Sequence, residues 1–169
     1  MDLRNLFLLG LCIIPLGCGG DGRPRLVKAT GKVTLDGAPL EAAIVAFQPI
    51  TDEKAKYQRP SNGISSATGE FTIGTYGTID GIPVGKYRVG VIKREVVGKL
   101  PDNYDEENAA AFNLSYKWVT PRDYSDPTTS GIEVEVTSSG IQPATIDMKT
   151  NGKPAEIEKT GPQKRALEP

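Results

Sequence analysis

Short runs of β-branched and aromatic residues, separated by clusters of Gly, Pro and Asp, follow one another along most of the chain after Leu26. No stretch between them keeps a helical period long enough for an amphipathic helix. In the segment IEVEV, Ile132, Val134 and Val136 point to one face of a strand while the two glutamates point to the other. This pattern predicts an all-β fold, a seven-stranded antiparallel sandwich. The predicted strands are Val27–Leu35, Ala43–Gln48, Ile64–Ala67, Glu70–Tyr76, Lys86–Arg94, Ile132–Thr137 and Thr145–Lys149.

Turn residues between these runs support the same fold. Asp36-Gly37 predicts a tight hairpin turn because Gly adopts positive φ at no steric cost. Gly69, directly before Glu70, predicts a second such turn. Tyr87 stands near the start of a strand, where its hydroxyl is expected to bond back to the preceding turn as in a tyrosine corner.

The amino-acid composition excludes several kinds of catalytic and metal-binding site. The 169 residues contain no histidine, so imidazole-based catalysis and imidazole metal ligation are excluded. The two cysteines, Cys12 and Cys18, both lie near the N-terminus, and the formal charge of −1 gives no long-range field for nucleic acid. The sequence therefore predicts a protein that is not an enzyme, uses no cofactor or metal, and does not bind nucleic acid.

The sequence pattern of the N-terminal residues predicts that the protein is exported from the cytoplasm. Leu6 to Gly17 is an uncharged apolar run, too short to span a bilayer and of the length of a secretory h-region. Gly17 before Cys18, followed by two glycines, resembles the lipobox of bacterial lipoproteins, which implies cleavage before Cys18 and its diacylation. Two acyl chains hold a protein stably to a membrane. The alternatives are an ordinary signal peptide with a structural cysteine, and an uncleaved anchor.

These features divide the chain into four parts. They are a signal peptide (1–17), the lipidated cysteine with its tether (18–25), the sandwich (26–150) and a disordered tail (151–169). The tether is short: seven extended residues from Gly19 reach at most roughly 25 Å. Gly19 also lacks the Asp that favours inner-membrane retention in lipoproteins, so the outer membrane is the favoured location of this exported protein.

Four segments carry a further resemblance. GKVTLDGAPLEAAIVAFQP (31–49), ATGEFTI (67–73), GIPVGKYRVGV (81–91) and PRDYSDPTTSGIEVEV (121–136) resemble the transthyretin-like, carboxypeptidase-regulatory-like domains of bacterial lipoproteins, of planctomycete type in particular. The resemblance implies a prealbumin-like sandwich that serves as an accessory or adhesive module. Enzymes that share this kind of fold depend on histidines that this chain lacks.

One long segment, Gly98 to Ser130, is a candidate binding region because loops of this length are usually functional or disordered. Its aromatic residues offer a stacking surface for a glycan or a protein partner. The alternative is a short helix, capped by Asp105, whose apolar residues cover one end of the sandwich. The candidate surface residues are Tyr104, Phe112, Tyr116, Trp118 and Tyr124.

Two charged loops are weaker candidates. The acidic stretch 102–108 holds oxygen ligands of the kind that calcium prefers, but it lacks the spacing of a calcium loop, so a solvated loop is the expected structure. Lys54, Lys56 and Arg59 lie with Tyr57 in a loop that is expected to be solvated, with anionic lipid or wall polymers as alternative partners.

The function predicted is therefore a non-enzymatic, lipid-anchored envelope protein whose sandwich serves as an interaction or scaffold module. The alternative is a glycan-binding accessory protein that uses residues 104–124. The expected partners are the membrane, through the diacylglycerol on Cys18, and an envelope protein or a glycan.

Overall fold

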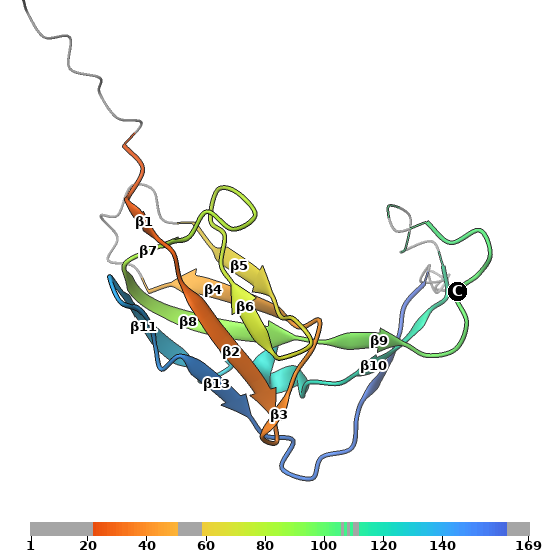
Figure 1. The fold of residues 1–169 in the computed structure, drawn as a ribbon. Helices are drawn as coiled ribbons and strands as arrows, with labels where there is room; N and C mark the ends of the chain where they lie inside the picture. The colour runs from red at the N-terminus through yellow and green to blue at the C-terminus, as the bar shows by residue number, and fades with distance from the viewer. Residues whose placement is uncertain (1–21, 51–58, 106, 108, 110–111, 162–169) are drawn as a thin grey trace, which may run out of the picture.

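A computed structural model describes residues 22–50, 59–105, 107, 109 and 112–161. In these residues the regular structure consists of β-strands and short 3-10 turns, which confirms the predicted all-β class. Two larger sheets face each other around a core, and a smaller sheet extends to one side (Figure 1). No helix in the described part of the chain is long and apolar enough to cross a membrane.

The first large sheet has five strands, and each is hydrogen-bonded to the adjacent strands in the antiparallel sense. They are, in spatial order, β12 (Gly140–Gln142), β11 (Glu133–Thr137), β8 (Gly85–Ile92), β4 (Ile44–Pro49) and β5 (Ser61–Ile64).

The second large sheet is built around the strand β2. Its strands are β13 (Thr145–Met148), β2 (Thr30–Leu35), β3 (Ala38–Pro39) and β6 (Glu70–Thr72). The strands β3 and β6 pair with β2 in the antiparallel sense, whereas β13 pairs with it in parallel. The sandwich is thus not antiparallel throughout.

The core lies between the two large sheets, because alternate residues of each strand point inward. From the five-stranded sheet come Phe47, Val89 and Val91, each with no exposed surface. From the other sheet come Val33 and other residues with little or no exposed surface, among them Phe71, Ile146 and Met148. The Phe47 ring packs against the rings of Phe71 and Tyr87, at centroid distances of 5.9 and 6.1 Å.

The predicted turns are confirmed. Asp36 and Gly37 join β2 to β3 with φ angles of 52° and 84°, and Gly69 precedes β6 with φ of 78°. The predicted back-bond of Tyr87 is also present, since its hydroxyl donates to the Pro83 carbonyl at 2.7 Å. Burial raises the pKa of Tyr87 to about 12.

One predicted strand lies elsewhere. Residues 64–67 were expected to form a strand, but β5 occupies Ser61–Ile64 and the chain turns after it. The reason is Ser65, a buried residue whose hydroxyl donates to the Leu40 carbonyl and accepts from the Ala43 amide. Position 63 within this strand requires glycine, because a Cβ there would lie 2.5 Å from the Thr72 carbonyl oxygen.

Two short strands close one end of the sandwich. The strand β1 (Leu26–Val27) pairs with β7 (Ile82–Pro83), and β8 starts two residues after β7. The chain therefore enters the sandwich beside the start of β8.

The small sheet lies at the opposite end of β8, and we call it the arm. Its strands are β14 (Ile157–Lys159), β10 (Ser115–Trp118) and β9 (Arg94–Val96), all antiparallel. The strand β9 follows β8 almost directly, so the arm continues the course of β8 beyond the sandwich (Figure 1).

The arm corrects one prediction and bears on another. The tail was expected to be disordered from Asn151, but residues 157–159 form β14, because β10 offers a free edge for pairing. Leu114 and Trp118 are buried, as expected from the alternative of a segment that covers one end of the sandwich, but neither belongs to the hydrophobic core cluster. Residues 162–169 lie outside the described part of the chain.

Candidate functional site

The arm gathers aromatic and charged side chains on one face. In the antiparallel register, Trp118 lies opposite Arg94, and Tyr116 lies opposite Val96 on one side and Glu158 on the other. Because alternate residues of a strand share a face, Tyr116 and Trp118 point to the same side of the sheet.

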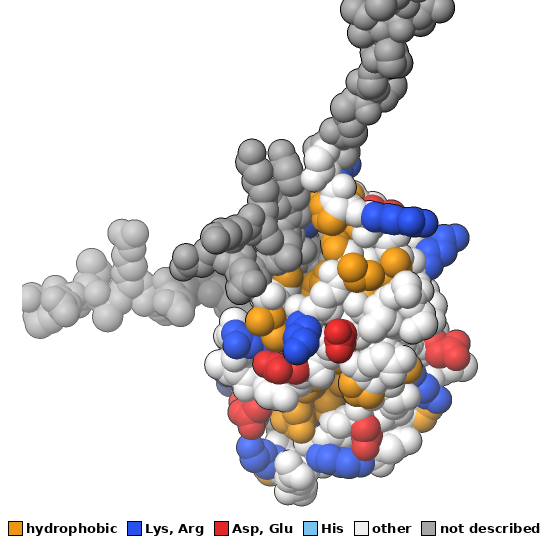
Figure 2. Space-filling view, turned by 90° about the vertical axis from the view of Figure 1, so that its left-hand side faces the viewer, with side chains coloured by type: hydrophobic (Ala, Val, Ile, Leu, Met, Phe, Trp, Pro, Cys, Tyr) orange, Lys and Arg blue, Asp and Glu red, His pale blue; other side chains and the backbone are white. Residues whose placement is uncertain are grey.

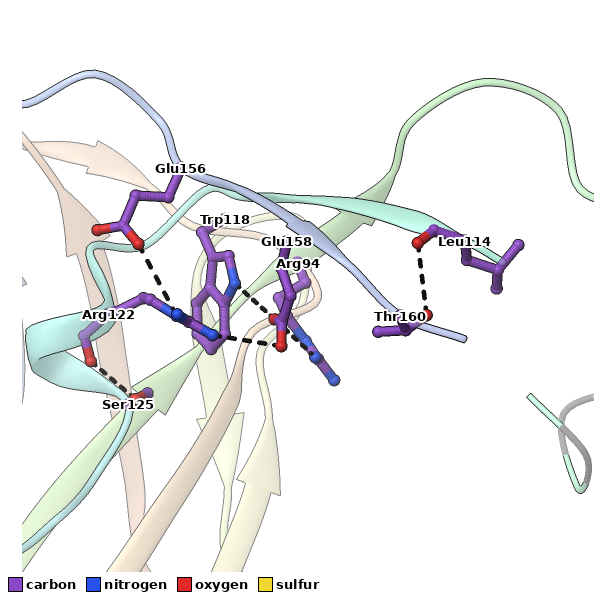
Figure 3. A network of polar contacts seen from close by, with 8 residues as sticks. All are labelled: Arg94, Leu114, Trp118, Arg122, Ser125, Glu156, Glu158 and Thr160. Atoms are coloured by element: carbon purple, nitrogen blue, oxygen red, sulfur yellow. Dashed lines mark hydrogen bonds and ion pairs between the residues drawn. The ribbon is translucent and has the colours of Figure 1, made fainter. Parts of the chain in front are cut away.

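Trp118 is at the centre of this face (Figure 3). Its ring is contacted by two guanidinium groups, with the central carbon of Arg122 4.8 Å and that of Arg94 5.3 Å from the ring centroid. Arg94 also lies over the ring of Tyr116, at 5.0 Å. Such cation–π contacts are favourable and gain strength when water is excluded. The indole nitrogen donates to the Glu158 carboxylate at 2.8 Å.

The Glu158 carboxylate contacts Trp118 and both arginines. It forms ion pairs with Arg122 at 3.2 Å and with Arg94 at 3.4 Å. The hydrogen bond from Trp118, together with the two arginines, lowers the pKa of Glu158, so the side chain is ionised at neutral pH. Glu156 adds a longer contact to Arg122, at 3.9 Å. We call Arg94, Trp118, Arg122 and Glu158 the arm network.

The arm network joins four elements from three separate parts of the sequence. Arg94 comes from β9, Trp118 from β10, Arg122 from the 3-10 turn η2 (Arg122–Tyr124) and Glu158 from β14. Backbone bonds support the pairing, from the Trp118 amide to the Glu156 carbonyl and from the Thr160 amide to the Leu114 carbonyl, both 2.8 Å. The network thereby fastens the C-terminal strand to the arm.

The arm network leaves little room for a small ligand. Trp118 is only 8% exposed, and both arginines and the glutamate are engaged with it. The hollow beside Trp118 and Arg122 has a volume of about 70 Å³, whereas ligand pockets usually measure about 300–1,000 Å³. A partner of the arm would therefore bind on its surface.

The five predicted aromatic residues fall into three groups. Tyr116 and Trp118 share the arm face, as described above. Tyr104 and Phe112 contact each other, with ring centroids 5.5 Å apart. Tyr124 lies in η2, packs against the sandwich core, and its hydroxyl lies 3.3 Å from both the carbonyl oxygen and the amide nitrogen of Lys149. No contact joins all five in the described residues.

Three members of the arm network were not predicted. Arg94 was placed at the end of a strand, Arg122 in a loop, and Glu158 in the tail. A weak indication of β14 exists, because Ile157 to Lys159 lies between Pro154 and Gly161, two residues that often mark the ends of a strand. The pairing partner of such a short segment cannot be read from its own residues.

Cys18 and Lys54 to Tyr57 lie outside the described residues. Among the described residues, no group of three or more Asp, Glu or Cys side chains is placed to hold a metal ion.

No family model, curated protein or solved structure matches this chain.

Proposed function

We propose that the chain is a non-enzymatic, lipid-anchored protein of the bacterial cell envelope, exported and favouring the outer membrane. Its sandwich, which we propose to be of the seven-stranded transthyretin-like type, serves as an interaction or scaffold module. The proposal rests on the lipobox-like sequence at Cys18 and on the resemblance of four segments to lipoprotein accessory domains.

The structural observation that supports the proposed interaction role is the placement of the chain's entry relative to the arm. The chain enters at β1, beside the start of β8, and the arm begins where β8 ends. The eight residues of β8 extend about 26 Å at roughly 3.3 Å per residue. A membrane anchor before β1 would thus leave the arm directed away from the lipid surface, where a partner can reach it (Figure 1).

Fatty-acid labelling with membrane fractionation tests the anchor. We expect the full chain to take up label and the Cys18→Ala variant to take up none. Cys12→Ala is the matched control, because it removes the other cysteine of the same apolar segment, and it should keep the label. Equal labelling of both variants, or no labelling of the parent, would contradict the anchor at Cys18.

A glycan-binding accessory role is the second candidate, and the contact between Tyr104 and Phe112 favours it. Both rings are half-buried, so part of each stays open for stacking on a sugar. A pull-down with envelope glycans should lose signal in Tyr104→Ala and keep it in Tyr87→Phe, whose ring is buried in the core. Equal binding by both variants would rule out this surface.

A further inference from the structure

The end of the sandwich where the chain enters carries an open hollow of about 550 Å³. We call this surface the β1 end, and it is lined by Arg25, Leu26, Val27, Lys28, Val84 and Ser138. Val84, just before β8, is 56% exposed although its side chain is wholly apolar. In the view of Figure 2, hydrophobic side chains gather below the point where the N-terminal trace leaves the sandwich, with Lys and Arg side chains beside them.

The charges at this end are mainly positive. Arg25 and Lys28 are exposed, and neither forms an ion pair within the described part of the chain. Nearby, the guanidinium groups of Arg23 and Arg59 stack on the Tyr76 ring, at 4.8 and 5.4 Å from its centroid. The chain as a whole has a formal charge of −1, so this cluster of cations is local.

The acidic residue of the adjacent loop does not offset these cations by contact. The Asp80 carboxylate accepts hydrogen bonds from the amides of Thr75, Tyr76 and Gly77, at 2.7, 3.1 and 2.8 Å. These bonds lower the pKa of Asp80 and hold its carboxylate within its own loop. Asp80 is therefore not paired with Arg25 or Lys28 in the described part of the chain.

The length of the tether decides which anion lies within reach. If Cys18 is acylated, the residues between it and Leu26 span at most roughly 25 Å, so the β1 end is the part of the sandwich nearest to the bilayer. In a bilayer the phosphate groups lie directly above the apolar acyl region. A surface with basic residues beside apolar ones can therefore contact both layers at once.

We propose that the β1 end is a docking surface for an anionic lipid bilayer. Arg25 and Lys28 contact the lipid phosphates, and Val84 and Leu26 lie at the apolar boundary. The inference rests on the proposed anchor and adds an orientation to it: the sandwich stands on its β1 end, and the arm is held away from the membrane.

Vesicle co-sedimentation tests the surface without the acyl chains. Every residue of the hydrophobic core cluster lies between Ala29 and Met148, so a chain from Gly19 to Pro169 retains the whole core. We expect this chain to bind vesicles of phosphatidylcholine with about 30 mol% phosphatidylglycerol at low salt, and to be released by about 0.5 M NaCl. The double variant Arg25→Gln/Lys28→Gln should bind about 30-fold more weakly.

A control variant that loses the same number of positive charges elsewhere distinguishes the effect of the β1 end from the effect of net charge. Lys117→Gln/Lys159→Gln removes two exposed lysines of the arm, and it should change vesicle binding by no more than about twofold. All four side chains are exposed, so circular dichroism should show the same fold in both double variants. Equal weakening by both, no vesicle binding by the parent, or equal binding to pure phosphatidylcholine vesicles would overturn the docking surface.

The vesicle experiment tests the docking surface, and the labelling experiment tests the anchor at Cys18, so one proposal can fail without the other. Charge-dependent vesicle binding together with an unlabelled full chain would leave the docking surface standing and remove the anchor. A labelled full chain whose 19–169 form ignores anionic vesicles would keep the anchor and overturn the docking surface. Binding to a soluble anionic glycan but not to vesicles would also overturn it.

Discussion

The sandwich and the arm are both β-structure, but different interactions hold them together. The sandwich buries a continuous set of apolar side chains between two sheets, with Phe47 in contact with two other aromatic rings. The arm has three strands of three or four residues, and its centre is one tryptophan enclosed by two arginines and a glutamate. Ile157, the apolar residue of β14, is 55% exposed.

Because the sandwich depends on apolar burial and the arm on ion pairs, the two regions should respond differently to acid and to salt. Apolar burial stabilises in proportion to the area removed from water and depends little on pH or moderate salt. Partly exposed ion pairs are screened by salt and disappear when the carboxylate is protonated. We therefore expect the arm to open under conditions that leave the sandwich folded.

The largest expected effect is Phe47→Ala. Removing a fully buried ring leaves a cavity beside Phe71 and Tyr87, so the free energy of unfolding should fall by about 3–5 kcal/mol. Denaturant unfolding followed by circular dichroism measures this change. Ile64→Thr is the control, because Ile64 is 68% exposed, and it should change stability by about 0.5 kcal/mol or less. Similar losses in both variants would show that the sandwich does not depend on its core in this way.

An intermediate effect is expected for Tyr87→Phe, which leaves the buried Pro83 carbonyl without its donor and should cost about 1–3 kcal/mol. The folded-state pKa of Tyr87 is raised from 10.0 to about 12. Folding therefore favours the protonated phenol, and its contribution is complete below pH 10 and is lost as the pH rises towards 12.

Denaturant unfolding at several alkaline pH values checks this prediction, with stability falling more steeply in the parent than in Tyr87→Phe. Tyr124→Phe is the matched control, because its hydroxyl contact with Lys149 is exposed and 3.3 Å long. Parallel pH profiles for the parent and Tyr87→Phe would contradict the role of this hydrogen bond.

The smallest effect on global stability is expected for Glu158→Gln, although its effect on the arm should be clear. Trp118 is the single tryptophan of the chain, so its fluorescence reports on the arm, whereas circular dichroism reports mainly on the sandwich. The variant should shift tryptophan emission to longer wavelength and leave the unfolding midpoint by circular dichroism nearly unchanged. Glu133→Gln, which loses an exposed 3.6 Å contact with Arg88, should change neither.

Acid should have the same effect on the parent. The pKa of Glu158 is lowered from 4.5, so its contribution is present above pH 4.5 and is lost as the pH falls through the lowered value. The tryptophan signal should then change before circular dichroism does. A single coincident transition by both probes would show that the arm and the sandwich unfold as one unit.

Residues that act through local geometry were predictable from the sequence. Asp36-Gly37 makes the expected turn because positive φ favours Gly there, and Tyr87 makes the expected bond because its acceptor, Pro83, is four residues away. The alternation in β11 likewise places Val134 and Val136 in the core. Each of these features depends on neighbours within a few positions.

Residues that depend on distant partners were not predictable. Glu158 was assigned to a disordered tail because its own segment has no apolar period, yet it pairs with Arg94 and Trp118, at sequence separations of 64 and 40 residues. The parallel pairing of β13 with β2 has the same origin, because it joins segments more than a hundred positions apart.

The sequence by itself determined the β class, the tight turns and the inward-facing residues of the long strands, because periodicity and backbone sterics are local. Only the tertiary structure decided that the C-terminal segment joins the arm, that Trp118 is enclosed instead of displayed, and that Arg25 and Lys28 flank an exposed valine at the end where the chain enters. The physical reason is that these contacts form between strands whose meeting depends on how the whole chain packs.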